Sequence, residues 1–198
     1  MVPDDIVAAL PARSGHFVME SGYHTDRWLT LDALFVDPHR IAPLVEALAA
    51  RIRTHAVTAV CGPLLGGAFL AQVLAGRLES RFYFTQPDAS RTDSGLFSAR
   101  YRLPPALIAR VRGERVAVVD DVISAGSSVR ATIASLADAG ASTVVVGVLL
   151  ILGDTGAAYF DQLGIPVEAL GRGALNLWTP DDCPLCRSGQ PLDDPRDR

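Results

Sequence analysis

Two adjacent carboxylates followed by a loop of small residues form the part of the sequence best suited to chemistry. Asp120 and Asp121 directly follow the apolar run at 116–119, and the loop consists of Ser124, Ala125, Gly126, Ser127 and Ser128. Such a loop at the start of a helix offers backbone N–H groups, hydroxyls and the helix dipole to one anion. Gly126 lets the backbone approach that anion closely. Because neighbouring carboxylates suit hydroxyls or a divalent ion, the segment predicts a site for a sugar phosphate.

Strand-like and helix-like segments alternate around this site. Strands are expected at 57–61, 81–85, 115–119, 142–152 and 165–170, and helices at 4–10, from Pro38 to Ile52, from Gly67 to Leu78, at 127–139 and at 155–163. This alternation predicts an α/β fold with a mostly parallel central sheet flanked by helices. In such sheets ligands bind beyond the carboxyl ends of the strands, where the acidic pair would lie.

Composition excludes several classes of protein. The chain has 198 residues, of which 49% are hydrophobic and 20% are charged, and its net charge is −4. This charge argues against bulk nucleic-acid binding, and no apolar run approaches the roughly 18 residues of a spanning helix. The first residues lack the pattern of a secretory signal. A soluble, cytoplasmic protein with no membrane partner is therefore expected. All 18 basic residues are Arg, so no reaction here can use a lysine.

Three segments together resemble a known family. The strand, acidic pair and small-residue loop resemble the signature of type I phosphoribosyltransferases. Segment 16–28 resembles the N-terminal S-G-x-x-[ST] part of orotate phosphoribosyltransferases, and segment 178–192 is similar to the C-P-L-C end of one branch. The resemblance implies a single domain at 1–178 with a small N-terminal hood at about 1–36, then a C-terminal hook and tail at 179–198. A homodimer is also implied.

The resemblance implies a role for each matched position. Asp120 and Asp121 would hold the ribose hydroxyls of 5-phosphoribosyl-1-pyrophosphate, and 124–128 would hold its 5-phosphate. A flexible lid at 86–102 would close over a neighbouring subunit's site, and Mg²⁺ would be held mainly by the substrate. The pyrophosphate loop would be Leu64, Leu65, Gly66 and Gly67, the hood over the base Ser21, Gly22, Tyr23 and His24, and the cations that balance the leaving group Arg91, Arg100 and Arg102.

The identity of the base stays open at this point. Orotate is favoured, but the family's Asp-Arg pair after the central strand is replaced by Asp154-Thr155, and the acidic Glu20 precedes Ser21. Another base, or a non-catalytic regulator that senses the sugar phosphate, is compatible with the same acidic pair.

The cysteines suggest a second, smaller site. Cys61 ends an apolar run and is expected to be buried, whereas Cys183 and Cys186 form a lone C-x-x-C. A structural zinc ion needs four ligands, so this pair could be half of a site completed by histidines or by a partner subunit. The alternative is a tight hook packed through Pro184 and Leu185.

Overall fold

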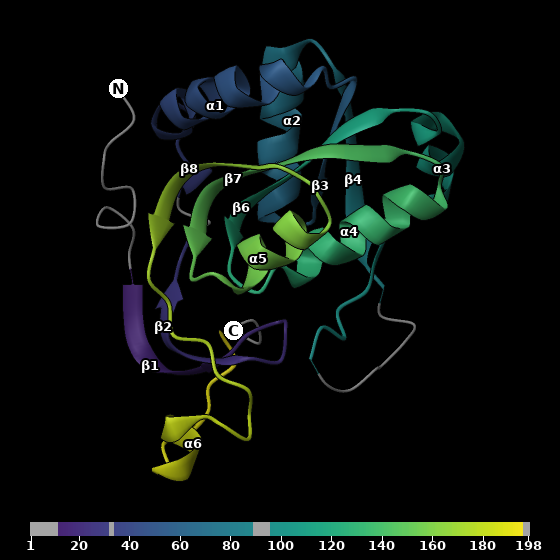
Figure 1. Cartoon of the computed structure of the whole chain (residues 1–198). Coiled ribbons are helices and arrows are strands. Elements are labelled where there is room, and N and C mark those ends of the chain that lie inside the picture. Colours follow the sequence, from purple (N-terminus) through teal and green to yellow (C-terminus); the bar gives the residue numbers. More distant parts are fainter. Residues whose placement is uncertain (1–11, 32–33, 89–95, 196–198) are drawn as a thin grey trace.

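The computed structural model describes residues 12–31, 34–88 and 96–195 (Figure 1). The helix expected at 4–10 and the lid residue Arg91 lie outside these ranges. The strands are β1 (Ala12–Val18), β2 (His24–Leu29), β3 (Ala59–Pro63), β4 (Arg81–Pro87), β5 (Tyr101–Arg102), β6 (Arg115–Ile123), β7 (Ser142–Leu152) and β8 (Val167–Gly173). The helices are α1 (Pro38–Ile52), α2 (Gly66–Leu78), α3 (Pro105–Val111), α4 (Ser127–Asp138), α5 (Thr155–Gln162) and α6 (Pro184–Arg187), with a 3₁₀ turn η2 (Arg53–His55) after α1.

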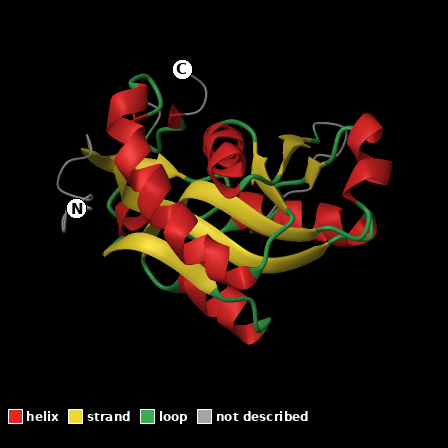
Figure 2. Ribbon diagram, turned by 90° about the horizontal axis from the view of Figure 1, so that it is seen from above, coloured by secondary structure: helices red, strands yellow, loops and turns green. Residues whose placement is uncertain are grey.

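A six-stranded sheet forms the centre of the molecule, with the strand order β5-β4-β3-β6-β7-β8. Neighbouring strands are parallel except for β5, which runs antiparallel to β4. Helices lie on both sides of the sheet, α1 and α2 on one and α4 and α5 on the other (Figures 1 and 2). The predicted α/β architecture is confirmed.

Strand β6 shows why both faces must be covered. Its side chains alternate between the two hydrophobic clusters: Ala117 and Val119 pack with residues of α1 and α2, and Val116 and Val118 pack with residues of α4 and α5. All four side chains are fully buried. Burial of successive residues on both faces is typical of a parallel strand between two helical layers. It holds the acidic pair at the end of a rigid element.

The hood is a separate two-stranded antiparallel sheet of β1 and β2. The C-terminal segment returns to it through the bridges Phe17↔Asp193 and His24↔Trp178. Within that segment Cys183 is fully buried, whereas Pro184 is exposed. The hook is therefore anchored through Cys183 more than through Pro184.

The predicted lid is more ordered at its ends than expected. Residues 86–87 and 101–102 pair as the ends of β4 and β5, and the N–H of Asp88 donates to the carbonyl of Arg100 at 2.9 Å.

Helix α3 was not predicted from the sequence. Its seven residues begin at Pro105, and proline suits the first position of a helix.

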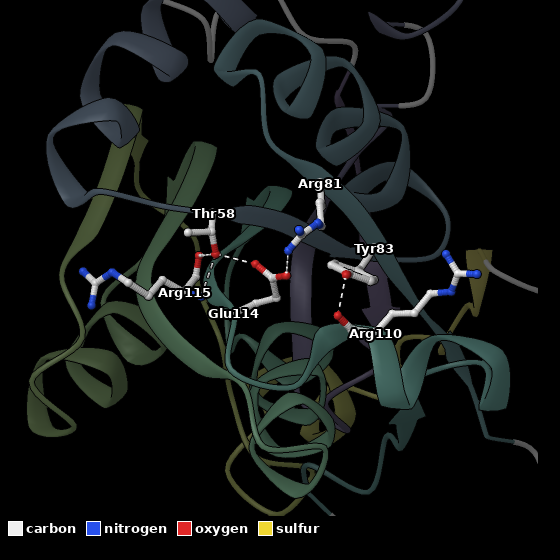
Figure 3. Close-up of polar contacts among 6 residues, drawn as sticks. All are labelled: Thr58, Arg81, Tyr83, Arg110, Glu114 and Arg115. Carbon is white, nitrogen blue, oxygen red and sulfur yellow. Dashed lines mark hydrogen bonds and ion pairs between the residues drawn. The ribbon is translucent and has the colours of Figure 1, made fainter.

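A buried carboxylate, that of Glu114, links the amino ends of β3, β4 and β6 (Figure 3). The acidic pair lies near the other end of β6. Glu114 accepts hydrogen bonds from the hydroxyl of Thr58 and the guanidinium of Arg81. The same hydroxyl oxygen accepts from the N–H of Arg115 at 2.9 Å. Glu114 is only 5% exposed, so its charge depends on these donors.

We predict that Glu114→Gln lowers the free energy of unfolding by about 1–3 kcal/mol, because a buried charge-assisted network loses its charge. Urea denaturation measures this change. The matched control is Glu46→Gln, whose ion pair with Arg77 is half exposed on both sides and should matter by less than about 1 kcal/mol. Equal effects of the two changes would contradict a special role for Glu114.

Candidate active site

A cavity of about 230 Å³ opens at the carboxyl ends of β3 and β6. Its walls come from four places in the chain: the hood, the loop after β3, strand β5 and the loop between β6 and α4. Most of the residues expected from sequence meet here, namely Ser21, Leu64, Leu65, Gly66, Asp120, Asp121, Ser124, Ala125, Gly126, Ser127 and Ser128. The structure thus brings most of the residues that were predicted to bind a sugar phosphate into one cavity.

The two carboxylates of the pair lie in different surroundings. Asp120 is buried, and its Oδ2 accepts from the hydroxyl of Ser128 at 2.8 Å while its Oδ1 accepts from the N–H of Asp121 at 3.0 Å. Asp121 is less buried, and its Oδ1 accepts from the N–H of Val122 at 2.8 Å. Burial, and then the charge of Asp121, raise the pKa of Asp120 well above its ordinary value. Asp121 is therefore the carboxylate of the pair that is more accessible to a ligand in the cavity.

The loop that begins α4 has the geometry of an anion site. Gly126 precedes the first helical residue with φ of 79°, a left-handed conformation that favours glycine. A Cβ at Gly126 would also stand 3.3 Å from the Phe160 ring. The hydroxyl of Ser127 is buried and has no hydrogen-bond partner among the described residues. A buried, unpaired hydroxyl at a helix start is suited to a bound phosphate.

The two glycines that begin α2, directly after the loop that follows β3, lie against the acidic pair without space for side chains. A Cβ on Gly66 would stand 2.5 Å from Oδ2 of Asp121, and one on Gly67 would stand 2.8 Å from Oδ1 of Asp120. The peptide bond between Leu64 and Leu65 is cis. Gly67 does not line the cavity but makes this close approach possible.

The hood contributes two residues that the sequence had not singled out, Met19 and Trp28, and one that it had, Glu20. Met19, Glu20 and Trp28 line the cavity together with Ser21. The carboxylate of Glu20 accepts from the hydroxyl of Tyr101 at 2.8 Å, so the hood is tied to β5. Met19, Glu20 and Trp28 all lie within the hood motif at 16–28, which was the available signal. Their orientation depends on the pairing of β1 with β2.

The remaining hood residues face elsewhere. Gly22, Tyr23 and His24 are not among the residues that line the cavity. The Tyr23 ring packs edge-on against Phe97, and the N–H of Phe97 donates to the carbonyl of Ser21 at 2.9 Å. The His24 ring is buried and lies beside His16 and Cys186.

The two lid arginines in the described part of the chain, Arg100 and Arg102, lie outside the cavity. Arg100 and Arg102 are exposed and are not among its lining residues. Arg102 forms an ion pair of 3.9 Å with Asp88. Their expected role at the leaving group would need the lid segment to move.

Comparison with known proteins identifies the class. A family model for the phosphoribosyl transferase domain matches residues 35–168. The orotate phosphoribosyltransferase of Thermotoga maritima is 34% identical over 93% of this chain and 91% of its own length. The chain therefore belongs to the phosphoribosyltransferase family.

Solved structures show the same fold. The crystal structure of orotate phosphoribosyltransferase from Aeropyrum pernix has a TM-score of 0.63 at 22% identity and covers 81% of this chain and 87% of that one. The APRTase from Giardia lamblia, solved with 9-deazaadenine, has a TM-score of 0.67 at 17% identity and covers 87% of this chain and 98% of that one.

Among the helices that the structure describes, none has the length and apolar character needed to span a membrane.

We predict that Ser127→Ala changes the free energy of unfolding by less than about 0.5 kcal/mol, because the hydroxyl has no partner to lose. The same change should weaken binding of ribose 5-phosphate about tenfold or more, as measured by titration calorimetry. Thr132→Val is the control, since the Thr132 hydroxyl is paired with that of Thr85 at 2.7 Å. It should lower stability by about 1–3 kcal/mol and leave binding intact. Unchanged binding in Ser127→Ala would show that this hydroxyl does not meet the phosphate.

Proposed function

We propose that this protein is an orotate phosphoribosyltransferase, which transfers the phosphoribosyl group of 5-phosphoribosyl-1-pyrophosphate to orotate and releases pyrophosphate. The observation that carries the proposal is the single cavity in which Asp121, the loop at 124–128 and the loop at 64–66 meet. Curated relatives that share 34% identity over 93% of the chain bear this name.

Each part of the cavity would hold one part of the sugar substrate. The N–H groups and hydroxyls of 124–128 would bind the 5-phosphate at the start of α4, where the helix dipole favours an anion. Asp120 and Asp121 would accept hydrogen bonds from the ribose hydroxyls. The backbone of Leu64, Leu65 and Gly66 would face the pyrophosphate.

The acidic pair also fits a divalent ion. Mg²⁺ prefers oxygen ligands and keeps much of its water, so it would arrive with the substrate and contact Asp121 more readily than the buried Asp120. When bound, Mg²⁺ would neutralise negative charge on the pyrophosphate. The protein's own contribution is to position the ribose and to offer the carboxylates.

The reaction would be a displacement at C1 of the ribose. The bond from C1 to the pyrophosphate oxygen breaks with its electron pair going to pyrophosphate, and a bond from C1 to the ring nitrogen of the base forms with inversion. That nitrogen passes its proton to the departing pyrophosphate, which balances the step. Because positive charge develops on the ribose when bond breaking leads, the carboxylates beside it stabilise the transition state. The lid must exclude water to prevent hydrolysis.

The base half of the site has a candidate for recognising a carboxylate. A smaller cavity of about 100 Å³ shares Met19, Trp28, Val122 and Ser124 with the first. Of the described residues that line these two cavities, only Arg27 is basic. Its guanidinium would take the place of the arginine that this chain lacks beside Asp154, and Trp28 would lie against the ring of the base.

The lid and the partner subunit complete the proposal. Arg91, Arg100 and Arg102 would balance the charge of the leaving pyrophosphate when the lid closes. Arginine can supply charge and paired hydrogen bonds to phosphate but not the proton that lysine can donate. A homodimer would let each lid cover the neighbouring site.

The test is pyrophosphate release from 5-phosphoribosyl-1-pyrophosphate and Mg²⁺, with orotate, uracil, adenine and hypoxanthine offered separately. Release with orotate alone is expected. Release with another base would keep the chemistry and replace the substrate. Binding of the sugar phosphate without release would favour a sensor instead.

We predict that Asp121→Asn lowers kcat by about 100-fold, because a charge beside the developing positive ribose is lost. Stability should change by less than about 1 kcal/mol, since Asp121 is only partly buried. Asp138→Asn, at the exposed end of α4, is the control and should keep full activity. A folded Asp121→Asn enzyme with an unchanged rate would defeat the assignment.

We predict that Arg27→Gln raises the KM for orotate by about 10- to 100-fold, because one charge-assisted contact is removed. The KM for 5-phosphoribosyl-1-pyrophosphate should stay constant. Arg13→Gln is the matched control in the hood, because Arg13 pairs with Asp193 at 3.2 Å and lines neither cavity. Steady-state kinetics with each substrate varied distinguishes the two arginines.

A further inference from the structure

Two histidines of the hood and two cysteines of the C-terminal segment converge on one point. His16 is on β1, His24 begins β2, Cys183 directly precedes α6, and Cys186 lies within α6. One ligand atom from each residue lies within 4.8 Å of all the others. His16, His24 and Cys183 are buried, with exposures of 3%, 5% and 0%. This cluster takes no part in the reaction proposed above.

Four of the six ligand-to-ligand separations are close to the edges of a tetrahedron of the size that zinc requires, and all six are within 4.8 Å. For tetrahedral Zn²⁺ with bonds of about 2.05 Å to nitrogen and 2.3 Å to sulfur, ligands are about 3.3 Å apart for two nitrogens and about 3.6 Å apart for nitrogen and sulfur. Here Nε2 of His16 is 3.1 Å from Nδ1 of His24. Sγ of Cys183 is 3.4 Å, and Sγ of Cys186 is 3.7 Å, from Nε2 of His16. Sγ of Cys186 is 3.3 Å from Nδ1 of His24.

The outer contact of His16 fixes which nitrogen can act as a ligand. Its Nδ1 lies 2.9 Å from the backbone carbonyl of Gln190. A carbonyl only accepts hydrogen bonds, so Nδ1 carries the proton and the lone pair of Nε2 points into the cluster. An imidazole oriented by a carbonyl in this way is the usual arrangement behind a metal-bound histidine.

The strand pairing explains how residues eight positions apart meet. Val18 on β1 is the partner of His24 on β2. The register of this pairing shifts between Ser14 and Phe17, and His16 lies within that irregularity. The ring centroids of His16 and His24 are 5.0 Å apart, so the two side chains meet on one side of the hood. The bridge from His24 to Trp178 and the bridge from Phe17 to Asp193 then bring the C-x-x-C segment over this side.

We propose that His16, His24, Cys183 and Cys186 form a structural Zn²⁺ site that fastens the C-terminal segment to the hood. Four protein ligands close the coordination sphere, which is typical of structural and not catalytic zinc. Two Zn–S bonds and two Zn–N bonds form as the two thiols release their protons to solvent. The resulting unit of one Zn²⁺, two thiolates and two neutral imidazoles carries no net charge, so it can be buried at low cost.

The site would act on the cavity through the hood. Residues 19–21, which line the cavity, belong to the connection between β1 and β2, and the two histidines lie on either side of that connection. A metal held by both strands and by α6 would fix the ends of the connection. The inference stands apart from the choice of base, because metal binding is measured without substrate.

The experiment titrates Co²⁺ into the reduced, chelator-treated full chain and records the visible and near-ultraviolet spectrum. We expect one equivalent of Co²⁺ with a thiolate-to-cobalt charge-transfer band and the intense d–d bands of tetrahedral coordination, both removed by one equivalent of Zn²⁺. The purified protein should hold one zinc per chain by elemental analysis, and chelation should lower Tm. A wild-type spectrum without the charge-transfer band would overturn the site, whatever the variants do.

Paired variants test the ligand set. The double change Cys183→Ser with Cys186→Ser should abolish the charge-transfer band, and His24→Asn should weaken Co²⁺ binding at least tenfold. Cys61→Ala and His39→Asn are the controls, since Cys61 lies in the core and His39 is exposed on α1. They should leave the spectrum unchanged. Metal binding retained by the double variant, or a disulfide between Cys183 and Cys186 in metal-free purified protein, would refute the proposal.

Discussion

The close packing of the loop after β3 against the end of β6 is the constraint on which the site depends. The pairing of these two parallel strands brings Gly66 and Gly67 to the carboxylates of Asp121 and Asp120, with no room for a Cβ at either position. The same contact forms one wall of the cavity and buries Asp120. A larger residue at position 66 or 67 would have to displace the acidic pair, so the geometry of the two segments is set together.

The core elements and the phosphate loop could be predicted from sequence because their signals are local. The run at 142–152 coincides with β7, and the helix starting at Pro38 coincides with α1, whose first turn is capped by the Asp37 carboxylate accepting from the N–H of His39 at 2.9 Å. The acidic pair and its loop lie within one strand–loop–helix unit. Their relative placement follows from chain geometry over a few residues.

The parts that sequence did not reveal depend on contacts between distant segments. The pairing of β4 with β5 shortens the lid, and only that pairing shows that Tyr101 meets Glu20. The C-x-x-C was recognised as half of a possible metal site. Its partners, His16 and His24, became visible only when the hood and the C-terminal segment were folded together. Arg27 was likewise not singled out from the sequence, and only the folded structure shows that it lines the smaller cavity.

The two polar networks of the sheet lie at opposite ends of the same strand. The Glu114 cluster surrounds the start of β6, and Asp120 lies five residues after Arg115. At about 3.3 Å per residue, roughly 16 Å of apolar strand separates them, beyond the range at which substitutions usually influence one another. Substitutions at the amino ends of the strands and substitutions at their carboxyl ends can therefore accumulate independently of one another. Changes that adapt the chain to a new temperature can accumulate at one end, while the choice of substrate is remodelled at the other.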